Sequence, residues 1–257
     1  MITVYPRKKL DFTYGNIFKA FLYSFSSLFS KKNIEKDIEA LWPDHKVIVG
    51  LSVRSIFDLL LEEKQYKKGS EVIMSGITIP DMVKIVEAHD LNVVPVDIDM
   101  QTLQVSEASI SDAITENTVM VVIAHLFGSR MNMDPVYKAL HSRPDIMIVE
   151  DCAQTYAGLN SYIKEAKTDL SMFSFGSIKS ITALGCAIGF TSNDELYSII
   201  KKRFSKYERV ANSRFRSKVL KYLLLKILSN PFIYGIFISI CKVLNIDYDK
   251  AIISTIR

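Results

Sequence analysis

The sequence predicts an α/β protein whose core is a mostly parallel sheet covered by helices on both faces. Short β-branched apolar runs alternate with amphipathic helical segments from residue 46 to residue 194. Within each run, both the odd and the even positions are apolar, as in strands that are buried on both faces. The chain has 257 residues, of which 49% are hydrophobic and 23% are charged. This composition fits one large domain with appendages and excludes a fibrous or disordered chain.

The first 45 residues are expected to form a helical arm. Residues 15–41 read as helical, with Phe18, Phe21, Leu22 and Phe25 on one face and a break around 30–33. The α/β domain is assigned to residues 46–194. Its expected strands are the runs at 46–50, 71–75, 92–97, 118–125, 146–151, 170–175 and 187–191. Helices are expected at 55–63, 81–89, 106–114 and 134–141. The pattern therefore predicts about seven strands, followed by a helical tail over 195–257.

Charge is unevenly distributed along the chain. The whole sequence has 32 basic and 28 acidic residues, and a net charge of +4 is too small to indicate a nucleic-acid partner. The stretch from Lys201 to Lys226, however, carries ten basic residues and only Glu208 as an acid. Three interpretations stay open for this run: a solvated helix face, attraction of a phosphate-bearing substrate, or peripheral contact with an anionic membrane through 201–241.

The cysteine spacing and the lack of a recognisable secretory signal favour a cytoplasmic protein. Cys152, Cys186 and Cys241 are odd in number and widely spaced, so we expect reduced thiols and no metal site. The N-terminus is charged and lacks the apolar core of a secretory signal. The most apolar stretch, 231–241, is shorter than the roughly 18 residues of a membrane span, which favours a buried or interfacial helix.

Polar residues that could carry chemistry follow several of the predicted strands. Ligands of open parallel sheets bind at the carboxyl ends of the strands. The residues at these ends include Asp151, Gln154, Ser174, Lys179, Ser52 and Arg54. A lysine in such a cleft can have its pKa lowered by burial and form a Schiff base with an aldehyde. A carboxylate opposite the lysine could hold a protonated ring nitrogen.

The order and spacing of these motifs resemble a known enzyme family. The strings VEDCAQ (149–154), DLSMFSFGSIK (169–179) and TALG (182–185) are similar to E-D-x-A-Q and G-D-x-x-x-F-S-F-x-x-x-K-x-x-T of the DegT/DnrJ/EryC1/StrS sugar aminotransferases. GSEVIMSG (69–76), PVDIDMQTL (95–103) and AHLFGSRMNMD (124–134) resemble further family segments in the same order. The resemblance covers about 46–194. It implies the large domain of a fold-type-I transferase with pyridoxal 5'-phosphate as cofactor.

The resemblance also implies roles for individual residues. Lys179 resembles the Schiff-base lysine, and Asp151 resembles the partner of the cofactor's pyridine nitrogen. A carboxylate there keeps that nitrogen protonated, so that the ring can absorb an electron pair. Gln154 is similar to the residue beside the ring hydroxyl, and Ser174 to a phosphate contact. His125 and Gly128 match a segment that we interpret as architectural.

The chain departs from the family pattern at three places. Ser52, Val53 and Arg54 stand where the family has S-G-T. The glycine that lets backbone amides approach the cofactor phosphate is therefore lost. We hypothesise that the Arg54 guanidinium replaces those phosphate contacts. Ile79 stands where the family stacks an aromatic ring on the cofactor. The family's small C-terminal domain is missing, and we interpret this as a truncation rather than a replacement by the helical tail.

The function implied by the resemblance is transfer of an amino group from an amino-acid donor to a keto-sugar, typically nucleotide-linked, in amino-sugar or polysaccharide biosynthesis. A homodimer is expected by the same resemblance. The family's related dehydration chemistry usually has histidine in place of the lysine, so Lys179 argues against it. A truncated, non-catalytic partner subunit or membrane-surface scaffold is the alternative. A dinucleotide-binding domain is rejected because no G-x-G-x-x-G follows the first strand.

Overall fold

A computed structural model of the chain describes residues 4–6, 10–25, 34–159, 162–177, 179, 181–207 and 211–247. The chain divides into two compact units, 1–31 with 209–257 and 32–208. The second unit is the α/β unit, and the first is called the helical unit below. The expected break at 30–33 and the final residues 248–257 lie outside the described residues.

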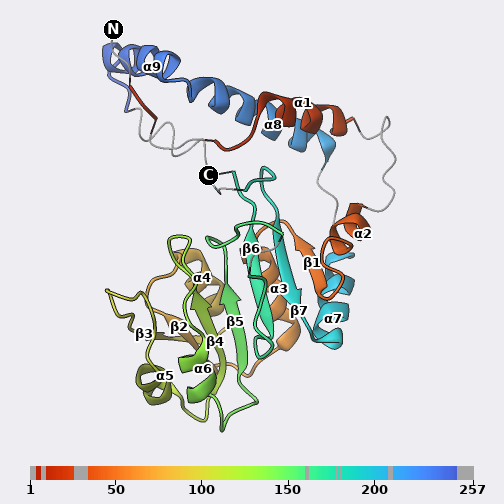
Figure 1. The fold of residues 1–257 in the computed structure, drawn as a ribbon, viewed down its shortest axis with the longest axis vertical. Helices are drawn as coiled ribbons and strands as arrows, with labels where there is room; N and C mark the ends of the chain where they lie inside the picture. Colours follow the sequence, from red (N-terminus) through yellow and green to blue (C-terminus); the bar gives the residue numbers. More distant parts are fainter. Residues whose placement is uncertain are drawn as a thin grey trace. The chain divides into compact units, whose positions relative to one another are not determined.

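The α/β unit is built on one seven-stranded sheet, which confirms the predicted fold class (Figure 1). Its strands are β1 (Lys46–Gly50), β2 (Glu71–Ser75), β3 (Asn92–Val96), β4 (Thr118–Ala124), β5 (Met147–Asp151), β6 (Leu170–Ser174) and β7 (Ala187–Thr191). They lie in the order β1-β7-β6-β5-β4-β2-β3. Only β7 runs against its neighbours β6 and β1, and all the other pairs are parallel.

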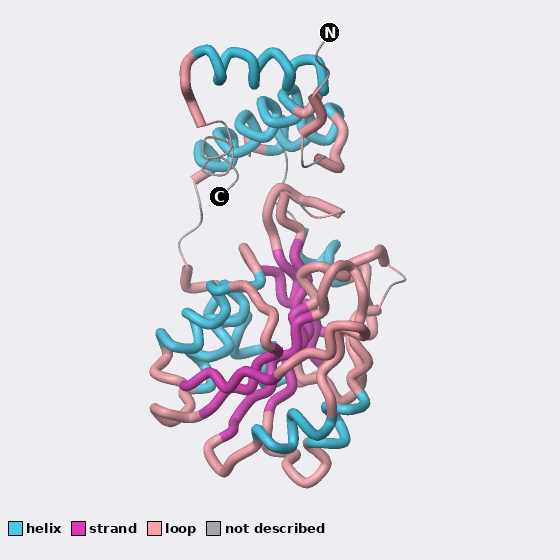
Figure 2. Tube along the Cα trace, turned by 90° about the vertical axis from the view of Figure 1, so that its left-hand side faces the viewer, coloured by secondary structure: helices cyan, strands magenta, loops and turns pink. Residues whose placement is uncertain are grey.

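Alternate side chains of the strands enter separate cores on the two faces of the sheet. Met120 and Val122 of β4 join one core, and Val121 and Ile123 join the other. The first core packs against helices α3 (Val53–Lys64), α4 (Pro80–Ala88) and α7 (Asp194–Phe204). The second packs against α5 (Glu107–Ala113) and α6 (Asp134–Ala139), and Figure 2 shows helices on both sides of the strands. Side chains at both odd and even strand positions are apolar because helices cover both faces of the sheet.

The end of the sheet near β1, β6 and β7 has a third core on the face opposite α3. Trp42 and Phe190 lie edge to face there with ring centroids 5.1 Å apart, and Phe173 contacts Phe190 in the same way at 5.6 Å. Aromatic rings fill this corner where the structure places loops instead of a long helix. They fix β6, the strand that precedes Lys179.

The helical unit combines the two ends of the described chain. It contains α1 (Tyr14–Tyr23), α8 (Asn212–Leu228) and α9 (Pro231–Val243). The Lys226 ammonium donates to the Leu10 carbonyl at 2.7 Å, and the Arg216 guanidinium donates to the Ser24 carbonyl at 3.3 Å. Among the described residues, no single helix is long and apolar enough to span a membrane. Together α8 and α9 reach that length and composition, but the pair is bent by 95°.

The compact units differ from the expected domain boundaries. Helices α2 (Ile34–Glu39) and α7 pack on β1 of the α/β unit, although residues 1–45 and 195–257 were expected to lie outside the domain at 46–194. The hydroxyl of Tyr197 donates to the Glu39 carboxylate at 2.9 Å, which ties α7 to α2. The basic stretch at 201–226 is also divided between the two units. Its α7 part pairs with acids, since Lys201 contacts Glu39 and Arg203 contacts Glu62.

Candidate active site

The topology gathers the predicted site residues at one edge of the sheet. Because β7 is antiparallel to both β6 and β1, the carboxyl end of β1 lies at the same edge as those of β2, β4, β5 and β6. Asp151 ends β5, and Lys179 follows the adjacent β6. Strand β1 lies two strands from β6, and β2 lies two strands from β5. At the usual strand spacing, each of these separations is about 10 Å.

Asp151 and Lys179 lie close enough to influence each other's charge. Burial raises the pKa of the Asp151 carboxyl, and the Ala153 backbone N–H, which donates to it at 3.0 Å, and the Lys179 charge oppose that rise. Burial lowers the pKa of the Lys179 ammonium, against the attraction of Asp151. Among the described residues, no hydrogen bond or ion pair holds the Lys179 amine or the second Asp151 oxygen. Both groups can therefore still form hydrogen bonds or ion pairs with a ligand.

Ser174 lies on the same tight loop as Lys179. Its Oγ accepts a long hydrogen bond of 3.4 Å from the Gly176 N–H, and the Lys179 N–H donates to the Gly176 carbonyl at 3.0 Å. A Cβ built at Gly176 would lie 3.5 Å from Ser174 Oγ and 4.0 Å from Lys179 Cγ. The loop therefore holds the hydroxyl and the lysine stem on either side of a residue without a side chain.

Gln154 is positioned by the loop that follows β4. Its Oε1 accepts the Phe127 N–H at 3.1 Å, and Phe127 adopts a left-handed backbone at φ 55°. The ring of Phe127 is 74% exposed at this edge of the sheet. Among the described residues, no hydrogen-bond partner is found for the Gln154 amide NH₂, and its role beside a cofactor stays a prediction.

Ser52, Arg54 and Ile79 lie at the N-termini of α3 and α4. Ser52 caps α3, and its hydroxyl accepts the Ser55 N–H at 3.1 Å. Arg54 forms an ion pair with Asp81, so the structure joins the loops after β1 and β2. Ile79 precedes Pro80 at the start of α4 and is 48% exposed. The structure thus brings Arg54 close to the Ile79 loop, while its guanidinium contacts a carboxylate of the chain itself.

A buried polar network supports Asp151 from the preceding position. Glu150 and His125 are both fully buried, and His125 Nε2 lies 2.7 Å from Glu150 Oε2. Because His125 Nδ1 accepts the Met131 N–H at 3.0 Å, its proton resides on Nε2 and is donated to Glu150. The hydroxyls of Tyr162 and Thr168 also donate to Glu150.

The hydrogen bonds of this network keep Glu150 ionised. Burial raises the pKa of the Glu150 carboxyl, but the donors His125, Thr168 and Tyr162 outweigh it, and the net pKa is lowered. Burial and the Glu150 charge raise the pKa of the Tyr162 hydroxyl. Arg130 covers the Tyr162 ring at 3.6 Å and pairs with Glu165. Sequence reasoning assigned no role to Glu150, although an acid inside an apolar strand is a signal for such a network.

His125, Glu150 and Cys152 also have the atom types of a metal site, with one ligand atom of each within 4.8 Å of the others. Both ring nitrogens of His125 already make hydrogen bonds, and burial raises the pKa of the Cys152 thiol well above its usual range. The three groups are therefore accounted for by the network around Glu150, and we derive no metal chemistry from them.

The sequence matches a family model over residues 30–223, that of the DegT/DnrJ/EryC1/StrS aminotransferase family. The chain belongs to this family. The match covers the whole strand series and extends into α8. It confirms the resemblance seen in the motifs around Asp151 and Lys179 and explains the fold-type-I sheet.

Two kinds of curated relative are found within the DegT/DnrJ/EryC1/StrS family. GDP-4-keto-6-deoxy-D-mannose 3-dehydratase of Yersinia pseudotuberculosis is 33% identical over 183 residues, which are 66% of this chain and 45% of the relative. L-glutamine:2-deoxy-scyllo-inosose aminotransferase of Micromonospora echinospora is 36% identical over 88 residues, 34% of this chain and 21% of the relative. The chain thus spans less than half the length of these two relatives.

Solved structures of the family share the fold. The Escherichia coli GDP-4-keto-6-deoxy-D-mannose-3-dehydratase with bound hydrated PLP has a TM-score of 0.66 at 20% identity and covers 78% of this chain and 54% of its own. A sugar aminotransferase of Micromonospora echinospora has a TM-score of 0.65 at 20% identity, covering 79% of this chain and 57% of its own. At these identities the likeness concerns the fold alone.

Proposed function

We propose that the chain is the large domain of a pyridoxal-phosphate-dependent aminotransferase that moves an amino group from an amino acid to a keto-sugar. The observation that carries the proposal is the Asp151–Lys179 pair, a buried carboxyl group that interacts with an amine for which no hydrogen bond or ion pair is found among the described residues. Family membership and the names of the relatives support the substrate class. The nucleotide-linked form of the sugar and a homodimeric assembly belong to the same proposal.

The donor set fits the cofactor. A pyridine nitrogen needs a buried anionic acceptor, an aldehyde needs an amine that is neutral part of the time, and a phosphate needs hydroxyl or cationic donors. Asp151 and Lys179 supply the first two, and Ser174 on the Lys179 loop supplies a hydroxyl. When bound, pyridoxal phosphate supplies an electron sink for the bond changes at the α-carbon of the amino donor.

The residues of the chain then have separate tasks. Lys179 would hold the cofactor through its amine, and its lowered pKa favours the neutral form, which can take up a proton at Nζ. Asp151 holds a proton on the ring nitrogen through charge and hydrogen bonding. Gln154, fixed through its Oε1 by the Phe127 N–H, would contact the cofactor through its amide NH₂. The Glu150 network keeps the end of β5 rigid beneath Asp151.

The experiment that tests the proposal is single-turnover amino transfer. Full-length protein is loaded with pyridoxal phosphate, and conversion of an added amino donor to its keto acid is followed with nucleotide-linked 4-keto-sugar as acceptor. Amino-sugar formation supports the proposal. Sugar deoxygenation without net amino transfer would indicate the dehydratase chemistry of the relatives, and absence of cofactor binding would indicate the non-catalytic alternative.

Replacing Asp151 by asparagine is expected to change stability and cofactor binding in opposite directions. The pKa of Asp151 is raised in the folded state, so its folding contribution is fully present below the ordinary aspartate pKa and is lost as pH rises through the folded value. Asp151→Asn should therefore stabilise the cofactor-free chain at neutral pH by roughly 0.5–2 kcal/mol. Loss of the charge-assisted contact should weaken pyridoxal phosphate binding by about 10- to 150-fold.

Urea unfolding at pH 7 and spectroscopic titration with the cofactor measure the two effects of Asp151→Asn. The asparagine oxygen can still accept the Ala153 N–H. A variant that is less stable and binds the cofactor unchanged would remove Asp151 from the site.

Arg54→Ala tests whether the arginine replaces the missing phosphate loop. Its ion pair with Asp81 is half exposed, so loss of that pair should cost at most about 1 kcal/mol of stability. If Arg54 contacts the phosphate when the cofactor binds, the alanine variant should bind pyridoxal phosphate about 10- to 150-fold more weakly. Asp81→Ala is the matched control, since it breaks the same ion pair but leaves the guanidinium in place. Equal cofactor affinity in Arg54→Ala and wild type would refute the phosphate role.

A further inference from the structure

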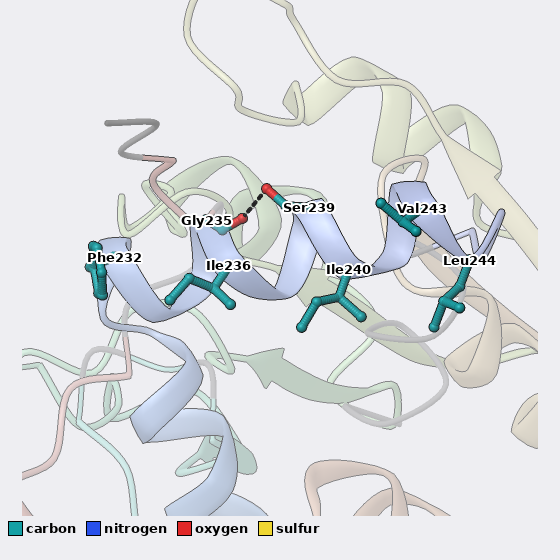
Figure 3. A pocket seen from close by; sticks show the side chains of 7 residues that line it. All are labelled: Phe232, Gly235, Ile236, Ser239, Ile240, Val243 and Leu244. Carbon is teal, nitrogen blue, oxygen red and sulfur yellow. Dashed lines mark hydrogen bonds between the residues drawn. The ribbon is translucent and has the colours of Figure 1, made fainter.

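Helix α9 exposes an apolar stripe along its whole length. Phe232, Ile236, Ile240 and Leu244 project from the same side of the helix and are 57%, 48%, 53% and 61% exposed (Figure 3). A depression of about 500 Å³ follows this side. Buried residues, among them Ile238 and Cys241, lie elsewhere on the helix. The stripe is therefore not the side by which α9 packs within its own unit.

The other two helices of the unit add to the exposed apolar surface. On α8, Leu220, Leu224 and Ile227 are all exposed and recur at the spacing of one helix face, whereas Val219 and Tyr222 form the buried face. On α1, Tyr14 and Phe18 are exposed at i and i+4. The apolar face predicted for α1 from Phe18, Phe21, Leu22 and Phe25 is thus partly exposed at both of its ends. Exposed apolar helix faces of this kind mark an interaction site.

The helical unit carries a large net positive charge. Residues 211–246 contain six basic residues and no acid. Three of them, Arg214, Lys218 and Lys221, share one face of α8 by their spacing. The sequence of the whole unit has 14 basic and three acidic residues, a net charge of +11, whereas residues 32–208 have 18 basic and 25 acidic residues, a net charge of −7. The exposed apolar stripe thus belongs to the strongly basic part of the molecule.

The combination of apolar surface and positive charge favours an anionic bilayer as the partner of the exposed stripe. A second copy of the helical unit would bring like charges together, which is unfavourable. The phosphates and acidic headgroups of an anionic bilayer carry the opposite charge, and its acyl chains accept the apolar stripe. Helix α9 has 13 residues and is about 20 Å long, shorter than the hydrocarbon core of about 30 Å.

We propose that the helical unit is an anchor for an anionic membrane surface. Helix α9 lies in the interfacial plane with Phe232, Ile236 and Ile240 among the acyl chains. The bend of 95° between α8 and α9 suits an in-plane segment rather than a straight span. The basic face of α8 contacts lipid headgroups. Arg216 and Lys226 serve a different purpose, because they hold α8 to the segment that contains α1.

Cosedimentation of the full chain with vesicles tests the proposal. We expect pelleting with phosphatidylcholine vesicles that contain phosphatidylserine at about 30 mol %, and much weaker pelleting with phosphatidylcholine alone. Ile236→Glu with Ile240→Glu should abolish binding to both vesicles. Arg214→Gln with Lys221→Gln should lower binding to the anionic vesicles by about 30-fold, since each basic residue near such a surface contributes about 1 kcal/mol. Its binding to neutral vesicles should not change.

Met100→Glu is the matched control. Met100 is 73% exposed on the α/β unit, so its replacement adds a charge outside the stripe and should leave vesicle binding unchanged. An unchanged far-ultraviolet circular dichroism spectrum shows that each variant keeps its helices. Failure of the wild type to pellet with anionic vesicles at low salt would overturn the proposal. So would equal pelleting of the wild type and the Ile236 and Ile240 variant, or self-association through this stripe without vesicle binding.

Discussion

Lys179→Ala should abolish both covalent attachment of pyridoxal phosphate and amino transfer. The alanine removes the amine that holds the cofactor and that takes up the proton, and no other described lysine lies at the carboxyl ends of β5 and β6. General acid–base groups contribute about 10²–10⁴-fold to rates, so turnover should fall by at least about 10²-fold. The visible absorption band of the bound cofactor and the single-turnover assay measure the two losses. Because Lys179 lies outside the strands β6 and β7, Lys179→Ala should keep the secondary structure of the chain.

Lys164→Ala is the matched control for this result. Burial also lowers the pKa of Lys164, but its amine donates to the Glu165 carbonyl at 2.8 Å and to Ser192 at 3.1 Å. It is therefore a half-buried lysine with a structural use, and its loss should leave the absorption band in place. An undiminished band in Lys179→Ala would contradict the assignment of the cofactor lysine.

Glu150→Ala should be the most destabilising single substitution around the site. It leaves the buried donors of His125, Tyr162 and Thr168 without their acceptor and opens space between β5 and the loop that follows it. Removal of one partner from a buried charged network costs about 3–5 kcal/mol, and urea or thermal unfolding measures it. Glu150→Gln keeps an acceptor for the His125 Nε2–H and should cost much less. Equal losses in the two variants would show that the charge, rather than the bonding, is what matters.

The same carboxylate gives a pH dependence with a defined sign. The pKa of Glu150 is lowered in the folded state, so its contribution to stability is present above the ordinary glutamate pKa and is lost as pH falls through the folded value. The stability difference between wild type and Glu150→Gln should therefore be largest at neutral pH and shrink in acid. Paired urea titrations at pH 7 and in the acid range measure this difference. A difference that does not depend on pH would mean that the group does not titrate with folding.

The strand series and the central pair of the site could be predicted because their signals are local. Runs such as 118–125 are apolar on both parities, and this property is dictated by helices on both faces of the sheet. Asp151 ends β5 and Lys179 lies on the loop after β6, so their positions along the sequence place both at the same sheet edge. Both predictions needed only the periodicity and the motif around each residue.

Contacts between distant segments could not be predicted in the same way. Lys226 contacts Leu10 across 216 residues, and no pattern in either segment indicates that the two chain ends form one unit. Arg54 meets Asp81 because α3 and α4 pack together, whereas the sequence offers several acids as equal partners. Such pairings depend on tertiary packing, which a single sequence does not encode locally.

The antiparallel position of β7 has a consequence for how the molecule forms during synthesis. Strand β1 emerges from the ribosome before the other strands of the sheet, yet its partner in the sheet is β7, and Lys46 pairs with Thr191. Closing so long a loop is slow, and β1 must remain unpaired until the last strand has been made. The Lys179 loop connects β6 to β7, so the docking that admits β1 also closes the segment that carries the lysine. The sheet edge that would receive the cofactor is thus completed only when β7 docks, and ligand binding would report that this docking has taken place.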